Sequence, residues 1–82
     1  MQTDRDARAQ VGTPEARYAN VFTIGHNALE FIIDFGQRYS THETPSAHTR
    51  IVTNPSYARA LLATLSEAIA EYERSFGVIP ER

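Results

Sequence analysis

Two carboxylates and an arginine in the middle of the chain are the first residues whose types and spacing could do chemistry. Glu30 and Asp34 share one face of a segment in which apolar and polar residues alternate, as they do in a β-strand. Four strand residues span roughly 13 Å, which exceeds the separation of the paired carboxylates in glycoside hydrolases. The two are therefore not predicted to form an acid–base pair. Arg50 has the parity to face one of them from a neighbouring strand, so the prediction is a cross-strand ion pair of Glu30 or Asp34 with Arg50 that fixes register.

The three histidines of the chain, His26, His42 and His48, are expected in a hairpin turn, in a loop and at the start of a strand. Their spacing differs from the close pairs with which a single helix or strand usually holds a metal ion. Convergence of His42, Glu43 and His48 in space would make a weak site, but scattered surface histidines are more common. Cysteine is absent, which excludes thiolate zinc sites and disulfides. No metal site and no cofactor is predicted.

Other signatures of catalysis and of charged partners are missing from the sequence. The serines and threonines lack a nucleophile elbow or a neighbouring base, and no glycine-rich loop is present to cradle a phosphate. The eight basic residues are all arginine and are spread along a chain of net charge −2, so no basic stripe favours nucleic acid. No run of eighteen apolar residues occurs, and the opening MQTDRDARAQVG is polar where a signal peptide would be apolar. We therefore expect a cytoplasmic protein that is not an enzyme and binds neither nucleic acid nor membrane.

Aromatic and β-branched residues predict three strands, at about residues 18–25, 28–36 and 47–53. Gly25 and Asn27 both tolerate positive φ, which predicts a tight hairpin between the first two strands. The polar segment between the second and third strands is predicted to be a surface loop. Alternation in the second strand predicts a core face and an outer face, the first made of Leu29, Phe31, Ile33 and Phe35, the second of Glu30, Ile32 and Asp34.

The final segment predicts one long helix with both ends marked. Asn54 is a preferred N-cap, and Pro55 suits the first helical position, where its missing N–H has no partner to lose. Gly77 can take the left-handed conformation that ends a helix at Phe76, and Pro80 follows it. Apolar residues recur at intervals of three and four, which predicts a face that packs on the second strand: Ala58, Leu61, Leu62, Leu65, Ala68, Ile69, Tyr72 and Phe76.

The predicted fold class is therefore α+β, a three-stranded antiparallel β-meander followed by one long C-terminal helix packed on one face. Residues 1–16 lack apolar periodicity and are expected to be a disordered tail, residues 17–79 a single βββα domain, and residues 80–82 a C-terminal tail. A domain this small buries only about 60% of its unfolded surface, so partner subunits often stabilise such chains. A homodimer is the predicted source of that support.

A second set of helix residues suggests where two subunits could meet. Its members, spaced 3-4-3-4 and mostly small, are Ala60, Ala63, Glu67, Ala70 and Arg74. Small residues would let a second helix approach closely. The alternative is that alanine fills exposed positions because it is a good helix former. Ile32 and Val52, on the sheet face that one helix cannot cover, would suit either a partner subunit or water.

Several separated motifs resemble a bacterial and archaeal family known as domain of unknown function 3467. The similarity covers about residues 18 to 80 and rests on Tyr18-Ala19-Asn20, Glu30-Phe31, Asp34-Phe35-Gly36, Arg50-Ile51, Pro55 with Ala58 and Leu61, Tyr72-Glu73 and Phe76-Gly77. The resemblance implies a small protein of this fold. It implies no catalytic residue and no substrate.

These observations predict a small non-catalytic, dimeric interaction or regulatory module with a possible unidentified protein partner. One alternative is a binding protein whose dimer cleft, near Asn20, Glu30, Asp34 and Arg50, takes a small ligand or a metal ion. A second alternative is a structural accessory subunit of a larger bacterial assembly.

Overall fold

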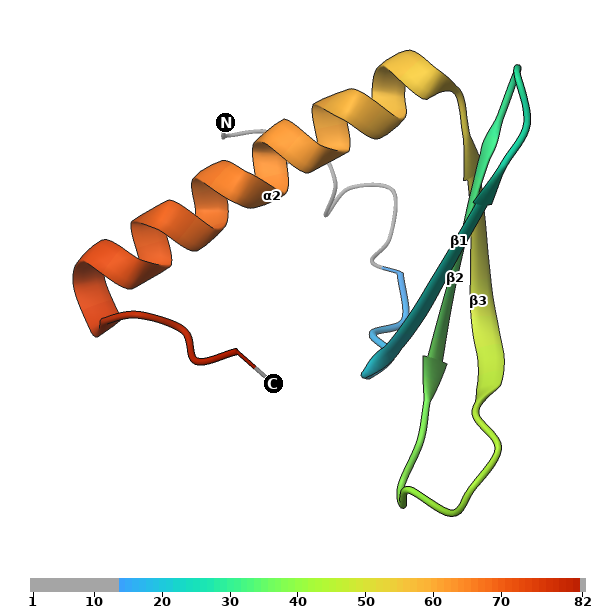
Figure 1. Ribbon diagram of the computed structural model, residues 1–82, viewed down its shortest axis with the longest axis horizontal. Coiled ribbons are helices and arrows are strands. Elements are labelled where there is room, and N and C mark those ends of the chain that lie inside the picture. The colour runs from blue at the N-terminus through green and yellow to red at the C-terminus, as the bar shows by residue number, and fades with distance from the viewer. Residues whose placement is uncertain (1–13, 82) are drawn as a thin grey trace.

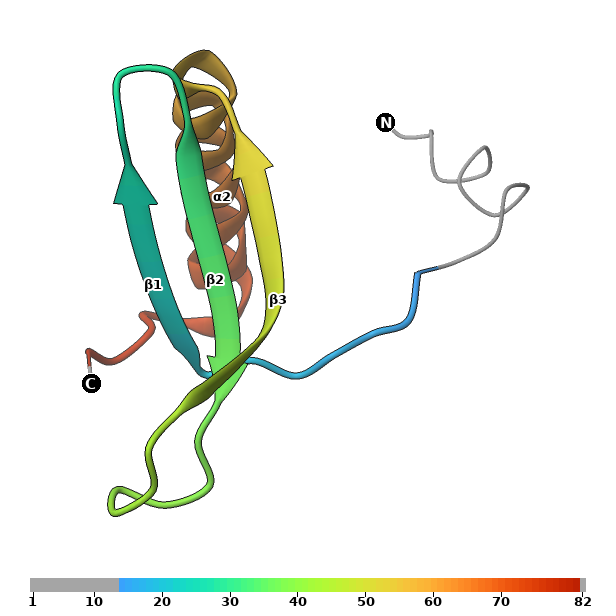
Figure 2. The same cartoon turned by 90° about the vertical axis from the view of Figure 1, so that its right-hand side faces the viewer.

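A computed structural model describes residues 14–81 of the chain. Its elements are β1 (Val21–His26), β2 (Phe31–Gln37), β3 (Ser46–Thr53) and α2 (Pro55–Phe76). The strands form one antiparallel sheet in the order β1-β2-β3, and α2 lies behind it in the view of Figure 2. This arrangement confirms the predicted meander followed by a C-terminal helix. The tail predicted for residues 1–16 lies outside the described residues up to position 13, and residues 14–16 belong to no helix or strand.

The register of the sheet decides which side chains share a face. Ile33 of β2 is paired with Ile24 of β1 and with Ile51 of β3. Because side chains alternate along a strand, the residues two positions away lie on the same side. We call this side the apolar sheet face; its large members are Phe22, Ile24, Phe31, Ile33, Phe35 and Ile51. The rings of Phe22 and Phe35 meet edge to face on it, with their centroids 5.7 Å apart.

The turn between β1 and β2 differs from the tight hairpin expected at Gly25 and Asn27. Gly25 lies inside β1, and within residues 14–81 Gly77 is the one residue with positive φ. The side-chain oxygen of Asn27 instead accepts hydrogen bonds from the backbone N–H groups of Leu29 and Glu30 at 2.8 and 2.9 Å. Asparagine closes a wider turn in this way without positive φ. Leu29, predicted to be a core residue, therefore lies in the turn and is 77% exposed.

Both ends of α2 lie where their capping residues predict. The side-chain oxygen of Asn54 accepts a hydrogen bond from the backbone N–H of Tyr57 at 2.8 Å, and Pro55 follows it as the first helical residue. Gly77, with φ at 98°, donates its N–H to the carbonyl of Glu73 at 3.0 Å. The Glu73 carboxylate also accepts the N–H of Ile79 at 2.8 Å, which holds the chain that follows the helix.

The helix leaves the sheet at an angle and does not lie flat on it (Figure 1). Asn54 alone connects β3 to α2, and its extended backbone (φ −95°, ψ 168°) is held by the cap. The extensive contacts between elements are those of β2 with β1 and with β3, and no residue of α2 is buried. Within residues 14–81, Ile33 is the one apolar side chain below a tenth exposed. The expected sealed core between β2 and the helix is thus not formed within a single chain.

Gly36 occupies the tightest place in the sheet, beside a register irregularity between Phe35 and Gly36. A Cβ atom at this position would lie 2.6 Å from the backbone carbonyl oxygen of Ser46. A backbone atom can move away only if the strand pairing shifts. The Asp-Phe-Gly motif therefore ends in glycine because β2 and β3 approach closely here.

Replacing Gly36 with alanine is expected to destabilise the protein by about 1–3 kcal/mol, the usual cost of forcing atoms into a filled site. The matched control is Gly25→Ala, because a Cβ there has no atom within 4 Å and φ is not positive. That control should be neutral or slightly stabilising. Urea unfolding of both variants at one protein concentration measures the difference, and equal midpoints would contradict this view of Gly36.

Candidate interaction surface

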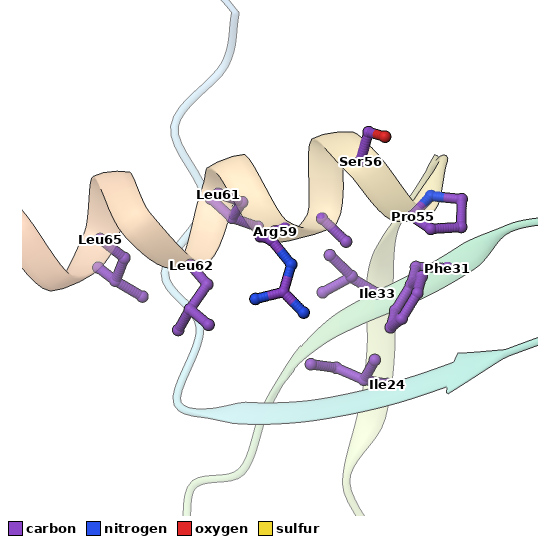
Figure 3. Close-up of a pocket in the computed structure, with 10 residues that line it drawn as sticks. Ile24, Phe31, Ile33, Pro55, Ser56, Arg59, Leu61, Leu62 and Leu65 are labelled. Carbon is purple, nitrogen blue, oxygen red and sulfur yellow. The ribbon is translucent and has the colours of Figure 1, made fainter.

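A large apolar hollow lies between the first half of α2 and the apolar sheet face (Figure 3). It is open to solvent and has a volume of about 600 Å³. We call it the wedge. Ile24, Phe31 and Ile33 line it from the sheet, and Leu62 and Leu65 are among the residues that line it from the helix. Arg59 is the charged residue of the lining; its side chain extends from the helix beside Leu62.

Each wall of the wedge leaves apolar side chains more than half exposed. Ile24 on the sheet is 62% exposed, and Leu62 and Leu65 on the helix are 60% and 54% exposed, whereas Ile33 at the centre of the sheet is 7% exposed. Soluble monomers rarely leave contiguous apolar patches this extensive in water, and those that do so usually bind something there. The wedge is therefore the strongest candidate for a functional surface in this chain.

The apolar side of α2 continues beyond the wedge. The residues spaced four and three apart form what we call the leucine stripe: Ala58, Leu62, Leu65, Ile69, Tyr72 and Phe76. Its first half faces the sheet, while the second half extends past the lining of the wedge. The rings of Tyr72 and Phe76 contact one another there, with centroids 5.0 Å apart. Because α2 leaves the sheet at an angle, the second half of the stripe lies beyond its own sheet face (Figure 1).

The residues predicted from the sequence as a subunit contact lie on the other side of the helix, and we call them the alanine stripe. At 3.6 residues per turn, the alanine stripe is centred about 160° around the helix axis from the leucine stripe. All five residues of the alanine stripe are exposed: Ala60, Ala63, Glu67, Ala70 and Arg74. Arg74 approaches Glu71 at 3.9 Å, an exposed pair on the same helix. The two stripes thus offer two different contact surfaces.

Asp34 and Arg50 lie directly opposite one another on β2 and β3, on the sheet face away from the wedge. Two hydrogen bonds join them, from Arg50 Nε to Asp34 Oδ1 at 2.8 Å and from the Arg50 terminal nitrogen to Oδ2 at 2.9 Å. The hydrogen bond from Arg50 lowers the pKa of Asp34, and the same contact raises the pKa of Arg50. Glu30 lies apart from this pair, in the turn before β2, where its carbonyl accepts the N–H of Asn27.

The histidines lie in three different settings. The loop between β2 and β3 holds His42, whose backbone N–H donates to the Ser40 hydroxyl at 3.1 Å. His26 stacks on Phe31 with ring centroids 5.4 Å apart. His48 lies at the register irregularity of β3, with Nδ1 2.7 Å from the Thr49 hydroxyl and Nε2 3.0 Å from the carbonyl of Tyr18. Among residues 14–81, no three His, Asp or Glu side chains lie close enough to share a metal ion.

A second, polar hollow of about 400 Å³ lies beside the start of β1, with Tyr18, Asn20, Arg38 and Tyr39 in its lining. The Asn20 side chain holds the backbone of Arg38 through two hydrogen bonds of 2.9 Å, one to its carbonyl and one from its N–H. The Nε atom of Arg38 is buried and has no hydrogen-bond partner among residues 14–81. Asn20 therefore fixes the backbone of an arginine whose Nε donor is unpaired within that range.

The sequence indicated only part of this surface. It identified the apolar residues of α2 but placed them against their own sheet, because periodicity reports which face is apolar and not what covers it. Phe22, Ile24 and Arg38 were not singled out. One signal was present in the sequence: a single residue, Asn54, joins the third strand to Pro55. Such a short link fixes the direction in which the helix leaves the sheet.

Comparisons with known proteins agree with the resemblance seen in the sequence. The sequence model of one family, described as "Protein of unknown function (DUF3467)", matches residues 2–81, nearly the whole chain. No curated protein and no solved structure matches. Within the described residues, no helix combines the length and the apolar character needed to cross a membrane.

The Asp34–Arg50 pair predicts a specific pH dependence of stability. The pKa of Asp34 is lower in the folded chain than its usual value of 3.8, so the pair stabilises the fold above that value and loses its effect as the pH falls through the lower folded pKa. Asp34→Asn should therefore reduce the loss of stability on acidification below about pH 4. Urea midpoints of the wild type and the variant from neutral to acid pH measure this. The control Glu30→Gln should follow the wild type, and parallel curves for wild type and Asp34→Asn would contradict the assignment.

Proposed function

The chain belongs to the DUF3467 family of unknown function, and we propose that it is a small non-catalytic interaction module that works as a homodimer. One observation supports this above the others: both walls of the wedge are apolar, and Ile24, Leu62 and Leu65 are each more than half exposed. Burying such surface is the main favourable term in protein association. A second copy would cover the apolar side chains that the sheet and the helix of one chain leave exposed. A regulatory or accessory role within a larger bacterial assembly is compatible with such a module.

The arrangement of ionisable groups supports a binding role over a catalytic one. Asp34 and Arg50 are engaged with one another, and His48 is bonded to its neighbours. An acid or base for catalysis needs to reach a substrate proton with a suitably tuned pKa. Within residues 14–81, the wedge presents Arg59 as its charged group and no carboxylate or histidine. Its lining suits an apolar surface of a protein.

A second candidate is the binding of a small anion in the polar hollow. The supporting observation is the buried, unpartnered Nε of Arg38. Arginine recognises carboxylates and phosphates through its planar donors, and the hydroxyls of Ser40 and Thr41 lie in the same lining. This hollow contains Asn20 from the predicted ligand cleft, but not Glu30, Asp34 or Arg50, which lie elsewhere.

Sedimentation equilibrium of the full chain should give twice the 9.2 kDa chain mass at micromolar concentration. The midpoint of thermal unfolding should also rise with protein concentration, because association stabilises the folded state by mass action. A mass of one chain at 100 µM, with a midpoint independent of concentration, would contradict the homodimer.

Inorganic phosphate and citrate test the polar hollow. Either anion at about 100 times its dissociation constant should raise the free energy of unfolding by about 2.7 kcal/mol. Arg38→Gln should abolish the increase, whereas the control Arg17→Gln, which changes a charge outside the lining, should keep it. No anion-dependent shift in the wild type would end this candidate.

A further inference from the structure

We propose that two copies join through their α2 helices, packed antiparallel along the leucine stripe about a twofold axis near Ser66. The C-terminal half of each helix then fills the wedge of the other copy. This inference rests on the proposed homodimer and names its contact surface. It assigns that contact to the leucine stripe and not to the alanine stripe.

The spacing of the leucine stripe suits a helix pair. Its intervals of 4-3-4-3-4 between Ala58 and Phe76 form the a and d positions of a heptad pattern, the seam along which two helices pack. The first half of the stripe faces the chain's own sheet across the wedge, and the second half has no sheet opposite it. In an antiparallel pair, the second half of one helix lies beside the first half of the other. Each helix would then bring Ile69 and Tyr72 into the space that its partner leaves open.

Charges beside the stripe select the antiparallel direction. Arg59, Ser66 and Glu73 repeat every seven residues along one edge of the stripe. In an antiparallel pair centred on Ser66, Arg59 of each copy faces Glu73 of the other, giving two ion pairs by symmetry. In a parallel pair this edge would face the opposite edge of the other helix, where Leu61, Ala68 and Ser75 offer no charge. Arg59 lines the wedge, where the second helix would bring this carboxylate.

The exposed apolar area is sufficient for a stable dimer. Nine large side chains of the apolar sheet face, the wedge and the leucine stripe are between 41% and 75% exposed: Phe22, Ile24, Ile51, Leu61, Leu62, Leu65, Ile69, Tyr72 and Phe76. With ~200 Å² for each side chain, they expose ~1,000 Å² per chain. Two copies could therefore bury up to ~2,000 Å², which is the size of obligate homodimer interfaces.

A second copy fits the wedge better than an unrelated partner because each chain offers both halves of the contact. An apolar helix stripe packs against an apolar sheet face, and this chain exposes one of each. Exchange between two identical chains satisfies both at once and closes the assembly as a twofold dimer. A different partner would have to supply both complementary surfaces itself.

Charge exchange on the full chain tests the pairing without filling or emptying a core, because Arg59 is exposed and Glu73 is not buried. Glu73→Arg also removes the hydrogen bond to the Ile79 N–H, whereas Arg59→Glu leaves it in place. Arg59→Glu and Glu73→Arg, each alone, should raise the dimer dissociation constant about tenfold by replacing two attractions with two repulsions. The double variant should return it to near the wild-type value. Reversal of the exposed Glu71 and Arg74 pair, away from the stripe, is the matched control and should leave it unchanged. A double variant as weak as the singles would overturn the antiparallel contact.

One further comparison distinguishes which of the two stripes forms the contact. Ile69→Glu on the leucine stripe should shift the protein to monomer, whereas Ala63→Glu on the alanine stripe should leave the measured mass at that of the dimer. The reverse result would overturn this inference and leave the homodimer standing. A wild type that is monomeric at 100 µM would overturn both. Circular dichroism of each variant shows whether the helix is retained.

Chemical cross-linking gives a readout that does not depend on weakening the dimer. The chain has no cysteine, so Ile24→Cys and Tyr72→Cys can be made in separate chains and mixed. A short bismaleimide should join the two different chains efficiently. The control mixture of Ile24→Cys with Ala70→Cys should join poorly, and equal yields would contradict the exchanged helix.

Discussion

The direction in which α2 leaves the sheet constrains everything else in this molecule. A single residue, Asn54, separates the last residue of β3 from the first residue of the helix. Its side chain caps the helix by bonding to Tyr57, and Pro55 fixes the backbone that follows. Laying the helix flat on the sheet would require this joint to change. The fold therefore holds two apolar surfaces apart, close at the joint and open beyond it.

The consequence is a chain whose apolar residues are patterned for a core that one copy does not complete. Ile33 is sheltered at the centre of the sheet, while Ile24 and Leu62 are more than half exposed and Ile69 is 41% exposed. Small domains without disulfides or metals often rely on a partner subunit to bury enough surface. The proposed helix exchange supplies this burial with residues that each chain already has. It also explains why the apolar stripe of α2 continues to Phe76, past the reach of its own sheet.

Local signals in the sequence predicted the elements well, because their causes are local. The strands follow from β-branched and aromatic residues, and the helix begins and ends where Asn54, Pro55 and Gly77 require. The turn after β1 was misplaced because Asn27 acts through its side-chain oxygen, which removes the need for positive φ. The partner of the apolar helix face could not be deduced from periodicity, since a stripe that packs on its own sheet and one that packs on a second chain have the same spacing.

The most direct measurement is an isotope-filtered nuclear Overhauser experiment on dimers mixed from labelled and unlabelled chains. It detects contacts between the two copies separately from contacts within one. Intermolecular signals between the Tyr72 ring or the Ile69 methyl groups of one copy and Ile24 of the other are the predicted result. Contacts from these helix residues confined to their own chain, or intermolecular signals confined to Ala63 and Ala70, would contradict the exchanged helix.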